Sequence, residues 1–145
     1  MSPSISLAAQ DRLRAAMSRH ERGDIAGALA EARSALDLAP DYADARSYLG
    51  STLVTRAGRY AEGLAELERA QELAPEDAAI AYTLGWCREF VAHRVSRRPQ
   101  AGLDPGELYR QAEAALRRCL ELGPDGKLKD DARDLLASII KEDVG

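Results

Sequence analysis

Cysteine and aromatic residues are scarce in this sequence. Aromatic side chains make up 5% of the 145 residues, with one Trp and one Phe. The two cysteines, Cys87 and Cys119, have neither the CxxC spacing of a zinc site nor the density of a disulfide-stabilised domain. We therefore expect neither a disulfide framework nor a metal site, and we predict that both thiols fill small positions in the core.

Long apolar runs and an excess of positive charge are also missing. No apolar run approaches the roughly 20 residues that a membrane-spanning helix needs. The segment Met1–Gln10 lacks the basic region and apolar run of a secretory signal. The formal net charge of −4 argues against nucleic acid as the main partner, because phosphate binding requires a positive field. We expect a soluble, cytoplasmic protein that binds neither membranes nor nucleic acid.

Catalytic patterns are equally sparse. No serine or cysteine stands in the context of a nucleophile elbow or a catalytic triad. The two histidines, His20 and His93, lie far apart in the sequence. The segment Gly102–Gly106 precedes an expected helix, but it lacks the lysine and the spacing of a phosphate-binding loop. The sequence therefore predicts a protein that is not an enzyme and holds no cofactor.

Alanine and regularly spaced apolar residues are abundant. Hydrophobic residues make up 46% of the chain and charged residues 30%, which is typical of a globular protein. Because alanine favours helix and lets helices approach closely, we predict an all-α fold with seven helices and no strands. Glycines and prolines delimit these helices at about residues 6–22, 25–39, 41–57, 60–73, 77–95, 105–122 and 128–141.

A repeat is visible in the prolines that end the helices. Pro40 and Pro75 are 35 residues apart, and Pro124 follows 49 residues later. The pair Leu49-Gly50 recurs 35 residues later as Leu84-Gly85. A small residue lies 12 and 5 positions before each of the three prolines: Ala28 and Ala35, Gly63 and Ala70, Ala112 and Cys119. Such repetition at a fixed spacing indicates stacked helix pairs.

These residues resemble the tetratricopeptide-repeat family, whose unit of about 34 residues consists of two antiparallel helices. The resemblance implies that the small residues let the paired helices meet and that each proline ends a unit. It also implies a right-handed α-α superhelix. The expected organisation is a single domain over residues 6–142, with repeats at about 9–42, 43–77 and 78–126, an insertion at about 93–104, and a capping helix at about 128–141.

In this family the first helices of successive repeats line a concave groove, which binds an extended peptide or a partner helix. The resemblance implies groove positions at Leu13, Met17, Tyr48, Tyr82, Trp86 and Phe90. The last three are four residues apart and form one ridge, which we call the aromatic ridge. Either the insertion or the last helix covers this ridge, or it is exposed with Trp86 as an anchor for a partner.

Some family members bind a C-terminal carboxylate through Lys, Asn and Arg side chains in the groove. The corresponding positions here carry no such group: Leu13, Met17, Tyr48, Ala79 and Thr83. Binding of a carboxylate at these positions is therefore not expected.

A basic cluster, Arg94, Arg97 and Arg98 beside His93, stands out in an acidic chain. It either complements the dipole at a helix end or binds an acidic peptide segment or a phosphate group. We predict a protein–protein interaction scaffold whose partner is a protein or peptide. The alternative is a self-assembly module, a homodimer joined through the aromatic ridge or the last helix.

Overall fold

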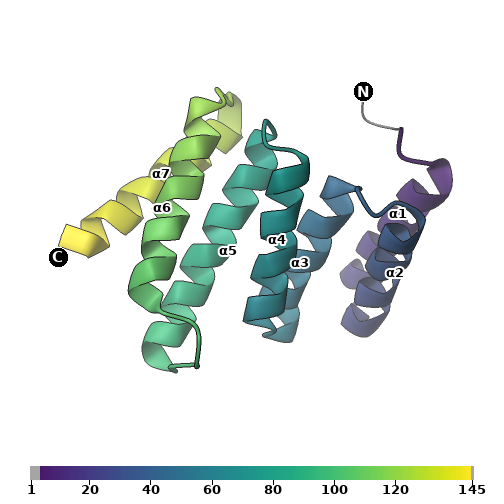
Figure 1. Ribbon diagram of the computed structural model, residues 1–145, viewed down its shortest axis with the longest axis horizontal. Helices are drawn as coiled ribbons and strands as arrows, with labels where there is room; N and C mark the ends of the chain where they lie inside the picture. The colour runs from purple at the N-terminus through teal and green to yellow at the C-terminus, as the bar shows by residue number, and fades with distance from the viewer. Residues whose placement is uncertain (1–3, 145) are drawn as a thin grey trace. The chain divides into compact units, whose positions relative to one another are not determined.

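A computed structural model describes residues 4–144 of the chain, which form seven α-helices (Figure 1). They are α1 (Leu7–Glu21), α2 (Ile25–Leu38), α3 (Ala43–Ala57), α4 (Tyr60–Leu73), α5 (Ala78–Arg97), α6 (Pro105–Glu121) and α7 (Gly126–Val144). No β-strand occurs in this range, where one isolated bridge joins Gln100 and Leu103. The predicted all-α helical-repeat fold is confirmed.

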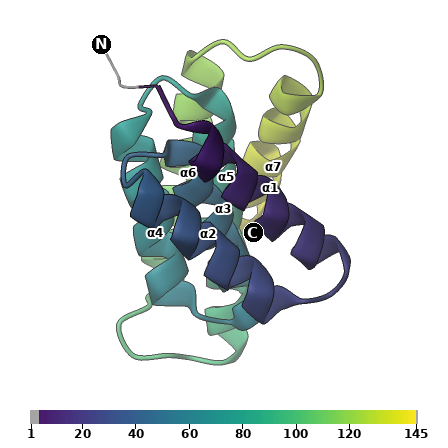
Figure 2. The same cartoon turned by 90° about the vertical axis from the view of Figure 1, so that its right-hand side faces the viewer.

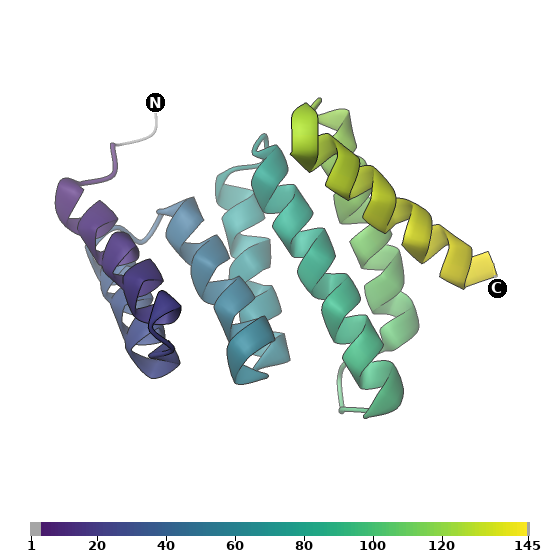
Figure 3. The same cartoon turned by 180° about the vertical axis from the view of Figure 1, so that it is seen from behind.

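The helices belong to two compact units, of which the first ends at Leu73 and the second begins at Ala74. In the first unit, α1 pairs with α2 and α3 pairs with α4, while α2 also contacts α3 (Figure 2). In the second unit, α5 pairs with α6, and α7 packs against both (Figure 3). The single domain over residues 6–142 stays a prediction.

Small residues allow the two helices of each pair to meet closely. A Cβ atom added to Gly50 of α3 would lie 2.6 Å from the carbonyl oxygen of Gly63 in α4, and one added to Gly63 would lie 2.6 Å from the carbonyl oxygen of Gly50. No side chain fits between these backbones. The other small residues spaced from the prolines are fully buried: Ala28, Ala35, Ala70, Ala112 and Cys119. The spacing in the sequence therefore located the contacts between paired helices.

The surplus residues of the third repeat lengthen its helices. The sequence predicted that this helix ends at about residue 95, but α5 continues to Arg97. No proline occurs in α5 before Pro99, and Pro99 disfavours helical geometry at the residue before it, Arg98, which is the non-helical C-cap of α5. As a result α5 has 20 residues, whereas α1 and α3 have 15 each. The additional turn at the C-terminal end of α5 contains Arg94 and Arg97 of the basic cluster.

The helix start predicted at Asp104 is confirmed. The carboxylate of Asp104 accepts a hydrogen bond from the backbone N–H of Glu107 at 3.3 Å, and Pro105 occupies the first helical position. Asp77 likewise caps α5 by accepting from the N–H of Ile80 at 3.1 Å. Each cap satisfies a backbone donor that has no partner within the helix.

Candidate functional site

Two of the predicted groove residues on the first unit differ in their burial. Leu13 of α1 is 6% exposed and packs with Ala35 and Ala45 in the core. Its side chain therefore contributes to packing and not to an accessible groove. Met17, one turn further along α1, is 45% exposed.

Tyr48 of α3, the third predicted groove residue in this unit, is half-buried and hydrogen-bonded to α1. Its hydroxyl donates to the carbonyl oxygen of Ala16 at 3.2 Å and lies 3.0 Å from Nδ1 of His20. Because the one hydroxyl proton is donated to Ala16, Nδ1 of His20 acts as the donor to Tyr48. Burial raises the pKa of Tyr48, which keeps the hydroxyl protonated. The side chain of Tyr48 therefore connects the groove face of α3 to α1 through hydrogen bonds.

The remaining polar groups on this face of α3 bond to their own helix. The hydroxyl of Ser51 donates to the carbonyl oxygen of Tyr48 at 3.1 Å, and that of Thr55 donates to the carbonyl oxygen of Ser51 at 2.7 Å. These hydroxyls have partners within α3 and do not require an external ligand.

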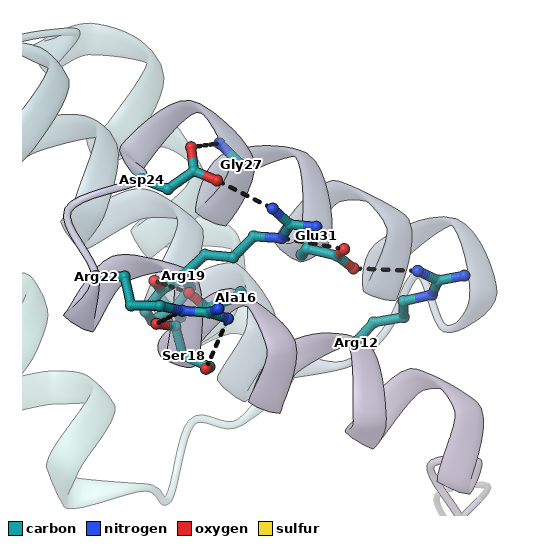
Figure 4. Close-up of polar contacts among 9 residues, drawn as sticks. Arg12, Ala16, Ser18, Arg19, Arg22, Asp24, Gly27 and Glu31 are labelled. Atoms are coloured by element: carbon teal, nitrogen blue, oxygen red, sulfur yellow. Dashed lines mark hydrogen bonds and ion pairs between the residues drawn. The ribbon is translucent and has the colours of Figure 1, made fainter.

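Charged side chains of the first unit pair with one another across its helices (Figure 4). Glu31 of α2 lies between Arg12 and Arg19 of α1, at 3.2 Å and 3.4 Å. Arg19 also contacts Asp24 at 3.0 Å, and Asp24 in turn caps α2 by accepting from the N–H of Gly27 at 2.9 Å. The guanidinium groups of Arg12 and Arg19 are therefore both paired with carboxylates of the same unit.

The aromatic ridge on α5 is covered at one end and open at the other. Tyr82 is half-buried against a core cluster that includes Ala132 and Ile139 of α7. Trp86 remains 37% exposed and stacks on Phe90, with ring centroids 5.5 Å apart and an interplanar angle of 21°. The last helix therefore covers Tyr82 and leaves a stacked aromatic pair accessible to solvent.

An open cleft of about 390 Å³ lies at the C-terminal end of α5. The described side chains that line it are His93, Arg94, Arg97 and Arg98, and we call it the basic cleft. The guanidinium carbon of Arg94 lies 4.8 Å from the centroid of the Phe90 ring, a cation–π contact. Arg94 of the basic cleft is therefore in contact with Phe90 of the aromatic ridge.

Tyr109 of α6 contacts His93, which lines the basic cleft, and the sequence did not predict this contact. Its hydroxyl lies 3.1 Å from Nδ1 of His93, and the two rings meet edge to face at 6.4 Å. No local sequence signal links residues 16 positions apart on different helices. The contact orients the imidazole of His93 at the rim of the cleft.

Both thiols are buried, as the sequence predicted. Burial raises the pKa of Cys87 to about 12 and also raises that of Cys119. A thiol in such surroundings stays protonated and is a poor nucleophile. The two cysteines therefore act as small core residues.

Neither a metal centre nor a membrane span is found in the part of the chain that the structure describes. No three His, Cys, Asp or Glu side chains within residues 4–144 are placed to hold a metal ion together. No helix in that range combines the length and the apolar character that crossing a bilayer requires. The cytoplasmic location stays a prediction.

The sequence matches no family model and no curated protein. Several solved structures are similar to it. The first tetratricopeptide-repeat domain of Spaghetti, bound to an HSP90 peptide, has a TM-score of 0.76 and 16% identity, over 97% of this chain and 96% of that one. The tetratricopeptide-repeat domain of Sgt2 from Aspergillus fumigatus has a TM-score of 0.75 and 15% identity, over 97% and 86%.

A third similar structure is the O-GlcNAc transferase of Thermobaculum terrenum, with a TM-score of 0.71 and 24% identity. The likeness covers 97% of this chain but 23% of the transferase. The class of fold is therefore the α-helical repeat. The particular fold is that of tetratricopeptide-repeat domains, as the spacing of the prolines and small residues predicted.

Proposed function

We propose that the chain is a non-catalytic scaffold that binds a peptide or a partner helix on the face formed by the first helices of its repeats. The observation that carries this proposal is the exposure of Trp86. The opposite stripe of α5 is buried, including Leu84, Val91 and Val95. Trp86 lies on the outer face of the helix and is held there by Phe90.

An exposed tryptophan on a rigid helix is a suitable anchor for a partner. Tryptophan is enriched among the residues that dominate binding energy at protein interfaces. Stacking on Phe90 already restricts its rotamers, so less conformational entropy is lost when a partner binds. The first domain of Spaghetti, which has the same fold, was solved with a peptide bound, and this supports the same use of the scaffold here.

The test uses Trp86, the one tryptophan of the chain. A peptide that covers its ring should shift the fluorescence emission to shorter wavelength. In a pull-down from the native source, Trp86→Ala should capture fewer proteins than the wild type. Leu38→Ala is the matched control, because Leu38 is an exposed apolar residue (54%) on α2. If the wild type and Trp86→Ala capture the same proteins, Trp86 does not anchor a partner and the proposal loses its main support.

The second candidate function is self-assembly. Ile140 of α7 is 38% exposed, so among the described residues of the second unit two large apolar side chains are exposed, Trp86 and Ile140. Sedimentation measurements separate the two functions. A mass that rises with protein concentration and returns to that of a monomer in Ile140→Ser favours self-assembly, whereas a monomer at all concentrations favours the scaffold.

A further inference from the structure

Among the described residues, the three arginines of the basic cleft have no acidic partner. Three other arginines of the second unit lie against carboxylates: Arg110 on Glu107, Arg117 on Glu113 and Arg118 on Glu121. Within residues 4–144 no ion pair holds Arg94, Arg97 or Arg98. The segment 90–103 contains no Asp or Glu, although the chain as a whole has a formal net charge of −4.

The helix dipole does not neutralise this charge. The C-terminus of a helix carries roughly half of a negative charge, whereas three guanidinium groups carry three positive charges. Each guanidinium offers its donors in a planar fork that matches a carboxylate or a phosphate. The basic cleft, of about 390 Å³, is open to solvent and is therefore accessible to anionic oxygens.

The exposed tryptophan and the basic cleft lie along one face of α5. Arg97 follows Trp86 by eleven positions, which at 100° per residue places the two within ~20° of each other around the helix. The same positions are ~16 Å apart along the axis, at 1.5 Å per residue. An extended peptide covers that distance in about five residues.

We propose that the basic cleft binds an acidic segment of the same peptide whose apolar residue contacts Trp86. The recognised element is an apolar residue followed or preceded, about four to five residues away, by carboxylates or a phosphorylated side chain. This inference rests on the proposed function, which supplies the contact with Trp86. A short acidic segment fits better than a polyanion, since the acidic remainder of the chain repels charge outside the cleft.

The experiment pans phage-displayed random peptides against the whole chain. The wild type should select peptides that combine an apolar residue with acidic residues at this spacing. Arg97→Glu/Arg98→Glu should lose the selection for acidic residues and keep that for the apolar residue. A selected peptide, made with a fluorescent label, should bind this variant at least about 10-fold more weakly at low salt, and added salt should narrow the difference.

The matched control is Lys129→Glu/Arg133→Glu, which makes the same change in net charge on α7. It should bind the selected peptide as the wild type does, and circular dichroism should show that both double variants are folded. Equal weakening by the two double variants would overturn the inference, because net charge alone would then explain the effect. Replacing the acidic residues of the selected peptide by one phosphoserine distinguishes the two sources of anionic oxygen: tighter binding assigns the cleft to phosphate and weaker binding assigns it to carboxylates.

Three further results separate this inference from the proposed function. Selected peptides that are neutral but depend on Trp86 would overturn the acidic ligand and leave the scaffold standing. Recovery of no peptide, or binding that is unchanged in Trp86→Ala, would overturn the scaffold and the inference with it. Tighter binding of labelled single-stranded RNA than of the acidic peptide, lost in Arg97→Glu/Arg98→Glu, would reassign the cleft to nucleic acid.

Discussion

Most arginines of the first unit pair with carboxylates of that unit, whereas in the second unit Arg94, Arg97 and Arg98 are exposed and have no carboxylate partner among the described residues. Arg33 of α2 pairs with Glu62 of α4 at 2.9 Å, and Arg46 of α3 pairs with Glu66 of α4 at 2.9 Å. Ion pairs of this kind, near the surface, typically contribute about 0.2–1 kcal/mol each. Pairing of this kind contributes little to stability, and the clearer difference between the units is which charges remain available to a partner.

The hydrogen bonds on the groove faces of the two units show the same contrast. In the first unit the hydroxyl of Tyr48 is shared between α1 and α3, and the neighbouring hydroxyls bond within α3. In the second unit Trp86 is exposed and the basic cleft lies at the C-terminal end of the same helix. In the repeat that contains α3, the hydroxyl groups on the groove face therefore form hydrogen bonds within the protein. The repeat that contains α5, which has the insertion, instead exposes side chains that suit a ligand.

The largest expected difference between the units concerns two glycines at equivalent positions, Gly50 and Gly85. The added Cβ of Gly50→Ala would meet backbone, the carbonyl oxygen of Gly63 at 2.6 Å. The added Cβ of Gly85→Ala would meet first the side chain of Leu116, at 2.9 Å, and its nearest backbone contact, the carbonyl oxygen of Ala112, is farther away at 3.3 Å. Overpacking costs roughly 1–3 kcal/mol, and glycine to alanine within a helix recovers up to about 1 kcal/mol.

We therefore expect Gly50→Ala to lower the free energy of unfolding by about 2 kcal/mol and Gly85→Ala to change it by less than about 1 kcal/mol. Urea denaturation followed by circular dichroism measures both. Gly106→Ala is the control, because Gly106 lies in the exposed first turn of α6 with no atom closer than 3.7 Å to its added Cβ. Equal losses at Gly50 and Gly85 would show that the backbone contact does not limit the packing of α3 on α4.

The parts of the structure that the sequence predicted are those in which one residue decides the local geometry. Gly50 and Gly63 were recognisable because a close contact between helix backbones needs small residues whatever surrounds them. The end of α5 was not recognisable, since none of Val95, Ser96 and Arg97 breaks a helix. In the candidate site, the exposure of Trp86 depends on where α7 packs, and Leu13 belongs to the core because it meets Ala35 and Ala45. Such tertiary contacts produce no pattern of regularly spaced residues in the sequence.

A smaller effect is expected from removing the hydroxyl that ties α3 to α1. Tyr48→Phe leaves the carbonyl oxygen of Ala16 and Nδ1 of His20 without this partner. The free energy of unfolding should fall by about 1 kcal/mol, the usual contribution of a partly buried hydrogen bond. Tyr42→Phe, also half-buried in the first unit, is the control, since the described residues offer its hydroxyl no hydrogen-bond partner. Similar stabilities of the two variants in thermal unfolding would mean that Tyr48 contributes through its ring alone.

Paired and unpaired arginines provide a direct test of the contrast between the units. Arg46 donates to Glu66 at 2.9 Å and to the carbonyl oxygen of Pro40 at 3.0 Å. Arg46→Met should therefore lower the free energy of unfolding by up to about 1 kcal/mol. Arg97→Met should change it by less than about 0.5 kcal/mol, as is usual for a surface substitution. A loss at Arg97 as large as that at Arg46 would identify Arg97 as structural and would argue against a cleft held open for a ligand.

The smallest effect should appear only in acid, at the cap of α2 in the first unit. The hydrogen bond from the N–H of Gly27, followed by that from Arg19, lowers the pKa of Asp24 below its usual value. The unfolded chain then binds this proton at a higher pH than the folded chain. The resulting stability is therefore present above the unfolded pKa and is lost as the pH falls through the folded pKa.

Asp24→Asn isolates this contribution, because asparagine also caps helices but does not titrate. The wild type should be slightly more stable than the variant near neutral pH, and the difference should shrink as the pH falls below about 4. Urea denaturation at a series of pH values, in buffers of equal ionic strength, measures it. A difference between the two proteins that does not change with pH would show that the cap acts only through hydrogen-bond geometry, and that the pairing of Asp24 with Arg19 adds nothing to the stability of the first unit.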